Sequence, residues 1–474
     1  MSRPLSPALA ALLLAAAAMP AAPASAAARA AGPVPAWAAS SAVPGAPSPA
    51  TPATPVTPAT PTASVGAPGG IPADQTGSAA LLPAADTVAR VLSQSPGVQA
   101  ARHLVEAEQA GQRQLRVGPH EWALGLNAER RRTDDPLRRQ GTDWTLSLER
   151  PWRLPGKQDA AEHLGSARVA AAEAAWLQAW REQARALLDA QVELWRERET
   201  ARVWQRQADL LDQQARAVAR RQQLGDASEV ERLQAEAAVA QARSQAVAAE
   251  GRARTAEQTL RLRFPGVEPG SATGPLPPPP SPAALTPPAG PAPDDSLAEA
   301  TGLPEWQAAE RVLQAQQAAL RAEELERRPD PTVGVRVGRS PLDGERQFGV
   351  ALTVPLGGAY RAAGVQASAA RLAAQQAQHD ELRRRLTAEA AARRERLHAS
   401  HASWRQAAEA AARLERSAQA LTRGQALGES SLAEVLAARR LAAEQGLAAA
   451  LAAVDAWSAH WQQALAAGRL WPAP

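Results

Sequence analysis

The fold is decided by two short stretches of sequence, Leu224-Gly225-Asp226-Ala227-Ser228 and Leu427-Gly428-Glu429-Ser430-Ser431, which lie 203 positions apart. Glycine directly after a helix favours the left-handed conformation of a C-cap, and a serine shortly afterwards is a preferred N-cap for the next helix. Each stretch therefore predicts a helix, a tight reversal and a second helix that returns along the first.

The proline distribution indicates how long these helices are. Of the 40 prolines among 474 residues, twelve lie in 33–83 and twelve in 265–293, whereas 156–264 and 356–471 contain none. Nothing in the two proline-free runs prevents a continuous helix. A helix over 158–222 would be about 100 Å long at a rise of about 1.5 Å per residue. A compact domain cannot contain such a helix.

Apolar residues in the proline-free runs recur at heptad-like spacing, as in Trp180, Leu187 and Leu194. Many further positions of this seam are alanine, which permits close approach of helix axes. Arg, Glu and Gln fill the intervening positions. Each half of the chain is therefore expected to end in a long, antiparallel, coiled-coil-like helical hairpin.

Short alternating segments precede each long run. Apolar and polar residues alternate with period two, which is typical of strands. Four strands, paired as two hairpins, are predicted at 121–130, 142–150, 332–339 and 347–354. A helix is expected before each pair, at about 86–116 and 304–327.

The same order of segments occurs twice, which indicates an internal duplication. At the N-terminus, Arg3, an apolar stretch up to Met19 and Ala24-Ser25-Ala26 are typical of a cleaved secretory signal. The Ala/Pro/Thr-rich segment after it predicts disorder. The predicted domains are a signal peptide (1–26), a disordered arm (27–85), a first structural repeat (86–264), a Pro-rich linker (265–298) and a second structural repeat (299–474).

The composition excludes several classes of function. Lys+Arg total 52 and Asp+Glu 48, with both signs interleaved, so no basic face for nucleic acid is expected. The chain has no cysteine, which excludes disulfides, thiolate metal sites and a lipid-modified N-terminal cysteine. No Ser/His/Asp ordering and no complete phosphate loop is found. We expect neither an enzyme nor a cofactor.

The predicted strands have one apolar and one polar face, as where Leu146 and Leu148 alternate with Ser147 and Glu149. Aromatic residues lie near the strand ends, where membrane barrels carry interfacial aromatics: Trp122, Trp144, Trp152 and Phe348. Four strands are too few for a barrel, but closure by several subunits would remove the open edges. The alternative is a soluble, half-buried β-hairpin.

The duplicated order of helix, strand pair, long helix, Leu-Gly-x-x-Ser tip and returning helix resembles the TolC-like outer-membrane efflux proteins over about 86–468. The resemblance implies a mostly α fold with a small β part. Its helical hairpins would form an α-barrel, and its four strands would join a trimeric 12-stranded transmembrane β-barrel. The segment 149–157, which ends Pro-Gly-Lys, is similar to the heavy-metal (cobalt-zinc-cadmium) branch.

Residue by residue, the resemblance extends to the tips. The matching residues are Leu224, Gly225, Asp226, Ser228, Leu427, Gly428, Glu429 and Ser431. In the family these tips meet the adaptor, although the same glycines and serines also cap helices. Family members often close the tunnel with an acidic ring before the second tip. Here 416–423 contains no acid, and the nearest one on that helix is Glu415, which does not support a charge-based cation gate.

Two other groups of polar residues suggest sites but are interpreted as solvated surface charges. His398 and His401 lie three apart, with Glu395 one turn before, which is a spacing that can hold a metal. The surrounding segment is rich in arginine and offers no further ligand set. Asp134 and Asp135 lie in a loop crowded with arginines, which neutralise them. No metal site is expected.

The resemblance implies a passive export duct in the outer membrane, with its helical part in the periplasm. Its partners would be two further copies of the chain as a homotrimer, a periplasmic membrane-fusion adaptor, an inner-membrane efflux pump and outer-membrane lipid. The resemblance does not identify the exported substrate, and metal cations are one candidate. Two alternatives are the periplasmic adaptor itself and a structural periplasmic coiled-coil protein without a barrel. Adaptors hold one hairpin with many strands, whereas this chain has two hairpins and few strands.

Overall fold

The computed structural model describes residues 81–132, 140–268, 274, 276–282, 293–340 and 344–473. By its contacts the chain divides into Met1–Gly69 and Gly70–Pro474, and every described residue belongs to the second unit. The predicted signal peptide and most of the predicted arm lie outside the described residues.

The two halves of the chain contain the same elements in the same order. The first half contains α2 (Ala85–Ser93), α3 (Pro96–Val117), β1 (Ala123–Arg132), β2 (Gln140–Pro151), α4 (Lys157–Gln223) and α5 (Glu229–Arg263). The second contains α6 (Pro293–Thr301), α7 (Pro304–Glu326), β3 (Thr332–Ser340), β4 (Glu345–Thr353), α8 (Ala359–Ala426) and α9 (Leu432–Ala466). The long helices have 67 and 68 residues, and both returning helices have 35.

The predicted single helix over 86–116 is wrong in one respect, because α2 and α3 are separate. Ser95 is extended, with φ −67° and ψ 139°, and Pro96 opens α3. A residue before proline is pushed out of the helical region, and proline fits best in the first turn of a new helix. Leu81 and Leu82, inside the predicted arm, are buried, and the indole N–H of Trp195 donates to the carbonyl of Leu81 at 3.1 Å.

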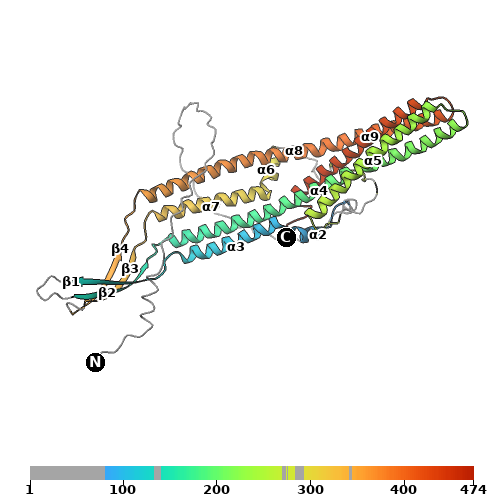
Figure 1. The fold of residues 1–474 in the computed structure, drawn as a ribbon. Coiled ribbons are helices and arrows are strands. Elements are labelled where there is room, and N and C mark those ends of the chain that lie inside the picture. Colours follow the sequence, from blue (N-terminus) through green and yellow to red (C-terminus); the bar gives the residue numbers. More distant parts are fainter. Residues whose placement is uncertain are drawn as a thin grey trace, which may run out of the picture. The chain divides into compact units, whose positions relative to one another are not determined.

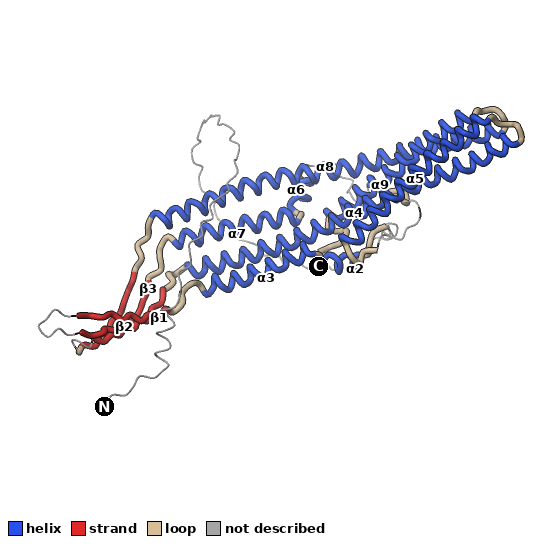
Figure 2. Tube along the Cα trace, viewed as in Figure 1, coloured by secondary structure: helices blue, strands red, loops and turns tan. Residues whose placement is uncertain are grey.

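The helices run lengthwise from the sheet at one end to the two tips at the other (Figure 1). Helix α4 contacts α3 and α7 along the half nearer the sheet and α5 and α9 along the half nearer the tips. Helix α8 packs in the same way, first against α7 and then against α9. Helices make up nearly the whole length outside the sheet (Figure 2). Among the described residues, no helix combines the length and apolarity that a membrane span needs.

The main core lies on α4 and α9, with α2 and the end of α5 packed against them. The predicted seam is confirmed, because Trp180, Leu187 and Leu194 are all buried. On α9, Trp457 and Trp461 stack with ring centroids 5.1 Å apart. Further toward the tips the core consists of small clusters in which alanine and valine pack with a few leucines, and the predicted use of alanine in the seam is confirmed.

The four strands form one antiparallel sheet in the order β1-β2-β3-β4. The predicted strands are confirmed, with ends that differ by a few residues. Because β2 pairs with β3, the sheet joins the first half of the chain to the second.

Candidate functional site

The most unusual surface is the apolar face of the sheet. Residues paired across antiparallel strands point to the same face, and the register aligns apolar side chains from all four strands. The two complete rows are Leu124, Leu148, Val335 and Val350, and Leu126, Leu146, Val337 and Phe348. These side chains are exposed, up to 73% for Leu126 and 78% for Phe348. A continuous apolar surface therefore covers this face.

The opposite face of the sheet carries polar side chains and glycines, most of which are more buried than the apolar face. Glycines there lie opposite larger polar side chains, as where Gly334 faces Glu149. A Cβ on Gly334 would stand 2.5 Å from Cγ of Glu149, so only glycine leaves room. The same pairing recurs at Gly125 with Ser147, Gly338 with Thr145 and Gly349 with Arg336. Sequence analysis missed this arrangement, which depends on register between distant strands.

The outer edges of the sheet are open in the single chain. Within the described residues β1 pairs only with β2, and β4 only with β3. Strand directions alternate, so β4 of one copy could lie antiparallel to β1 of another. Unpaired backbone groups at such edges invite pairing with another chain.

The first tip ends α4 in a Schellman motif. Gly225 is left-handed, with φ 86°. Its N–H donates to the carbonyl of Gln222 at 3.0 Å, and the N–H of Asp226 donates to the carbonyl of Arg221 at 2.8 Å. These two bonds satisfy carbonyls that the end of a helix leaves free.

The second tip repeats this geometry at the end of α8. Gly428 has φ 83° and donates to the carbonyl of Gln425 at 3.1 Å. The N–H of Glu429 donates to the carbonyl of Gly424 at 2.8 Å. Both glycines therefore hold the C-cap conformation that the sequence predicts.

Capping boxes start both returning helices. The N–H of Ser228 donates to Glu231 at 2.7 Å, and the N–H of Glu231 donates to the Ser228 hydroxyl at 3.2 Å. Ser431 and Glu434 repeat these bonds at 2.8 and 3.2 Å. Hydrogen bonds from the backbone and then from the serine hydroxyl lower the pKa of both glutamates. The capping role of the predicted tip serines is confirmed.

The two tips lie side by side at the end remote from the sheet (Figure 1). Leu224 and Leu427 are 78% and 76% exposed. Val230 after the first tip is also exposed, whereas Leu432 at the second is buried against Val218 of α4. The structure thus brings the predicted tip residues together on one surface with two exposed leucines.

The side chains just behind the tips are hydrogen-bonded between helices. Glu415, the acid that is nearest to the second tip on α8, accepts from Arg439 of α9 at 3.1 Å. Arg439 also donates to the hydroxyl of Thr422 at 3.2 Å. Gln214 of α4 donates to Gln425 of α8. The Glu415 carboxylate is therefore neutralised by an arginine within the same chain.

A buried ionic cluster joins the sheet to the helices. The chain's single lysine, Lys157, has a 2% exposed side chain at the start of α4. Its ammonium lies 3.0 Å from Glu326, the last residue of α7, and 2.9 Å from Asp330, in the loop between α7 and β3. Sequence analysis missed the cluster, because the partners lie far along the chain. The feature of the sequence that could have indicated the cluster is the single lysine directly after Pro155-Gly156.

Asp330 organises this cluster. It accepts from the N–H of Leu154 at 3.0 Å and contacts His120 Nε2 at 3.1 Å. Burial alone would raise the pKa of Asp330. The bonds from Leu154, Lys157 and His120 outweigh burial and lower that pKa. The loops that connect the helices to the strands are thus tied to one carboxylate.

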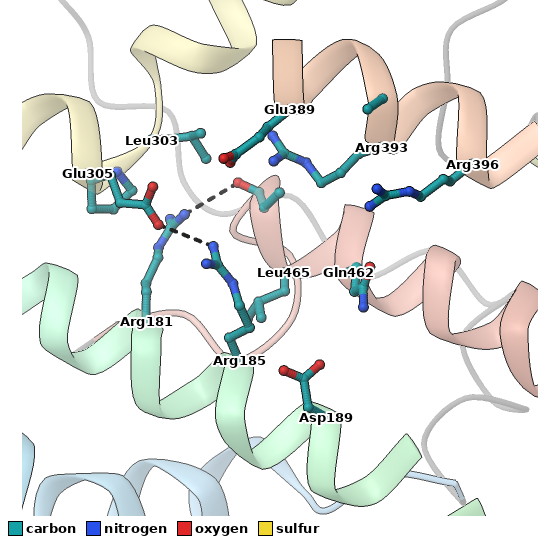
Figure 3. Close-up of a pocket in the computed structure, with 13 residues that line it drawn as sticks. Arg181, Arg185, Asp189, Leu303, Glu305, Glu389, Arg393, Arg396, Gln462 and Leu465 are labelled. Atoms are coloured by element: carbon teal, nitrogen blue, oxygen red, sulfur yellow. Dashed lines mark hydrogen bonds and ion pairs between the residues drawn. The ribbon is translucent and has the colours of Figure 1, made fainter. Parts of the chain in front are cut away.

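A cavity of about 380 Å³ lies where α9 ends and α7 begins, between α4 and α8 (Figure 3). Arg181 of α4 donates to the carbonyl of Ala466 at 3.3 Å, and Arg185 donates to Glu305 at 3.2 Å. Burial lowers the pKa of Arg181 and raises that of Asp189. A cation at the C-terminus of α9 and an anion in the first turn of α7 both complement helix dipoles. We interpret this cavity as a structural contact in which charged side chains link two helix ends.

The sequence singled out two further groups of polar residues. His398 and His401 lie on α8, and His401 lies beside Trp404 with ring centroids 5.4 Å apart. Within the described ranges, no three His, Asp or Glu side chains are grouped so that they could hold a metal. Asp134 and Asp135 lie outside the described residues.

Comparison of structures relates this chain to outer-membrane channels. The CmeC outer membrane channel of Campylobacter jejuni matches with a TM-score of 0.64 at 14% identity, over 82% of this chain and 86% of that chain. The outer membrane protein VceC of Vibrio cholerae matches at 0.65 and 18%, over 81% and 95%. The MtrE outer membrane channel of Neisseria gonorrhoeae matches at 0.54 and 16%, over 82% and 90%. No family model and no curated protein matches the sequence.

The chain therefore has the fold of the TolC-like outer-membrane channels. The neighbours are channel proteins and not enzymes. The predicted fold class, helical hairpins with a small four-stranded part, is confirmed.

Proposed function

We propose that this protein is the outer-membrane channel of a tripartite efflux system. The observation that carries the proposal is the apolar face of the sheet, exposed on all four strands at the end of helices about 100 Å long. Water-soluble proteins rarely expose contiguous apolar patches of more than a few hundred Å². A lipid environment would cover this face and leave the polar, glycine-lined face toward an aqueous lumen.

Closure of the sheet supports a homotrimer. In lipid every backbone polar group needs a partner, so open strand edges do not occur there. Two copies would give an eight-stranded barrel, and side chains would nearly fill its interior. Three copies would give twelve strands and an open pore, with β4 of each copy paired to β1 of the next.

The helices would continue the pore through the periplasm. Three copies would place the long helices and their returning partners around one tunnel, with all tips at its far end. The tips would dock on a periplasmic membrane-fusion adaptor, which links the tunnel to an inner-membrane pump. The duct would be passive, with direction supplied by the pump.

The cargo suggested by 149–157 is a metal cation. Within the described residues of one chain, no three His, Asp or Glu side chains are grouped so that they could hold such a cation. The neutralised Glu415 favours a tunnel closed by interhelical hydrogen bonds over one closed by an acidic ring.

Membrane fractionation and electrophoresis test the proposal. The full-length protein should be recovered with the outer membrane and should migrate as a trimer until it is heated in detergent. In a planar bilayer it should form a discrete conductance. Recovery as a soluble periplasmic protein would refute the channel and favour the coiled-coil alternative.

The tips can be tested separately. A Cβ on Gly225 or Gly428 meets no atom within 4 Å, so Gly225→Val and Gly428→Val cost mainly the left-handed backbone, about 1–2 kcal/mol each. We expect membrane insertion to persist and export to fail. Gly251→Val, at an equally open position within α5, is the control and should leave export intact. Normal export by both tip variants would refute the docking role.

A further inference from the structure

The outer base of the sheet carries a second cavity, of about 560 Å³, which combines positive charge with apolar surface. Three arginines line it together with two tryptophans, and no carboxylate is among the described residues that line it. Its lining residues include Arg116, Arg150, Arg153, Trp122 and Trp152. The cavity lies where β2 leaves the sheet toward α4.

Two of the arginines have guanidinium N–H groups that are available to a ligand. Arg150 stacks over the Trp122 ring at 5.3 Å, and its Nε donates to the carbonyl of His120 at 3.1 Å. Its two terminal nitrogens have no other partner among the described residues. Arg116 has a 73% exposed side chain and pairs only loosely with Glu162, at 3.6 Å through Nε.

The third arginine fixes the floor of the cavity. Arg153 donates through Nη1 to the carbonyl of Arg116 at 3.2 Å. Through Nη2 it donates to the carbonyls of Leu115 and Lys157, both at 3.3 Å. Its guanidinium is therefore immobilised against the end of α3, and no carboxylate among the described residues pairs with it.

Polarity changes along β2 in one direction. Arg150 and Leu148 point to the same outward face, two residues or about 7 Å apart. Val333 lies opposite Arg150, and Val335 lies opposite Leu148. Beyond Leu148 the face stays apolar through Leu146. A ligand that fits this gradient has an anionic head beside the arginines and an apolar chain along β2 and β3.

We propose that this cavity binds the phosphate group of a phospholipid from the periplasmic leaflet, with an acyl chain lying over Leu148 and Val335. The inference rests on the proposed outer-membrane location. Arginine is well suited to phosphate, because its planar donors bind two oxygens at once. The exposed Trp122 and Trp152 flank the head at the depth where interfacial aromatics sit. The apolar half of the cavity favours a lipid over free phosphate.

Native mass spectrometry of the detergent-purified protein tests this, with dioleoylphosphatidylglycerol as the added lipid. We expect one tightly held lipid per chain. Arg150→Gln with Arg116→Gln should weaken that binding by about tenfold or more, since each change removes a charge-assisted contact. Arg413→Gln, which alters an exposed arginine on α8, is the matched control and should change nothing.

Three results would overturn the proposal. One is equal lipid retention by wild type and the double variant. Another is loss of the lipid from both on addition of millimolar inorganic phosphate, which would indicate a free phosphate site. The third is equal loss in the Arg413→Gln control. Fractionation of the same variants distinguishes a failure of the lipid-site proposal from a failure of the channel proposal. A protein that is recovered as soluble but still binds lipid at Arg150 would refute only the channel.

Discussion

Replacing Lys157 by methionine should destabilise the protein by about 3 kcal/mol. Removing one partner of a buried ion pair costs about 3–5 kcal/mol, because the other charge stays buried and unpaired. Here the lysine side chain is 2% exposed, and its ammonium contacts two carboxylates. Glu326 is 47% exposed and can be resolvated, and Asp330 keeps the Leu154 N–H and His120. We therefore expect a loss of stability at the lower end of the range of about 3–5 kcal/mol.

Guanidinium unfolding in one detergent, followed by tryptophan fluorescence, measures this loss. Arg413→Met removes an exposed pair with Glu409 and should leave the midpoint within error, since such pairs contribute little. Adding Asp330→Asn to Lys157→Met should recover part of the loss, and the double-mutant cycle gives the coupling. Equal midpoints for Lys157→Met and Arg413→Met would refute a desolvated cluster.

Two further predictions concern the sheet and pH. Gly334→Ala should reduce the heat-modifiable trimer, because its Cβ would lie 2.5 Å from Cγ of Glu149; assembly equal to that of Gly251→Ala would contradict this. Burial lowers the pKa of His460 from its ordinary value of 6.5 to about 4, so between these pH values the unfolded chain binds a proton that the folded chain does not. Stability should thus be full above about pH 6.5 and fall toward about pH 4. His460→Leu should flatten this profile in denaturant midpoints, and an unchanged slope would exclude His460 as its source.

The features that sequence predicts well are local. The left-handed glycines and capping serines of the tips follow from residues within one turn of each other, and the strands follow from period-two alternation. Trp180 and Leu187 mark a helical seam because heptad spacing is itself a local pattern. These signals survive in the structure because no tertiary contact opposes them.

The missed features depend on contacts between distant residues. Lys157 meets Asp330 only after β2 and β3 pair, so no spacing in the sequence indicates the cluster. The glycines opposite Glu149 and Ser147 become meaningful only in the strand register. The break between α2 and α3 was readable from the sequence, since Pro96 marks it.

The two halves of the chain are fastened to each other at the sheet, by β2 with β3, and along the helices, by α4 with α7 and with α9. A trimer built on these links would present six tips of two alternating kinds. The residue directly after the capping serine is the exposed Glu229 in one kind of tip and the buried Leu432 in the other. A docking partner would therefore meet threefold rather than sixfold symmetry. Six identical partner subunits would have to bind in two different environments. This difference would fix the rotation of the partner about the threefold axis of the trimer.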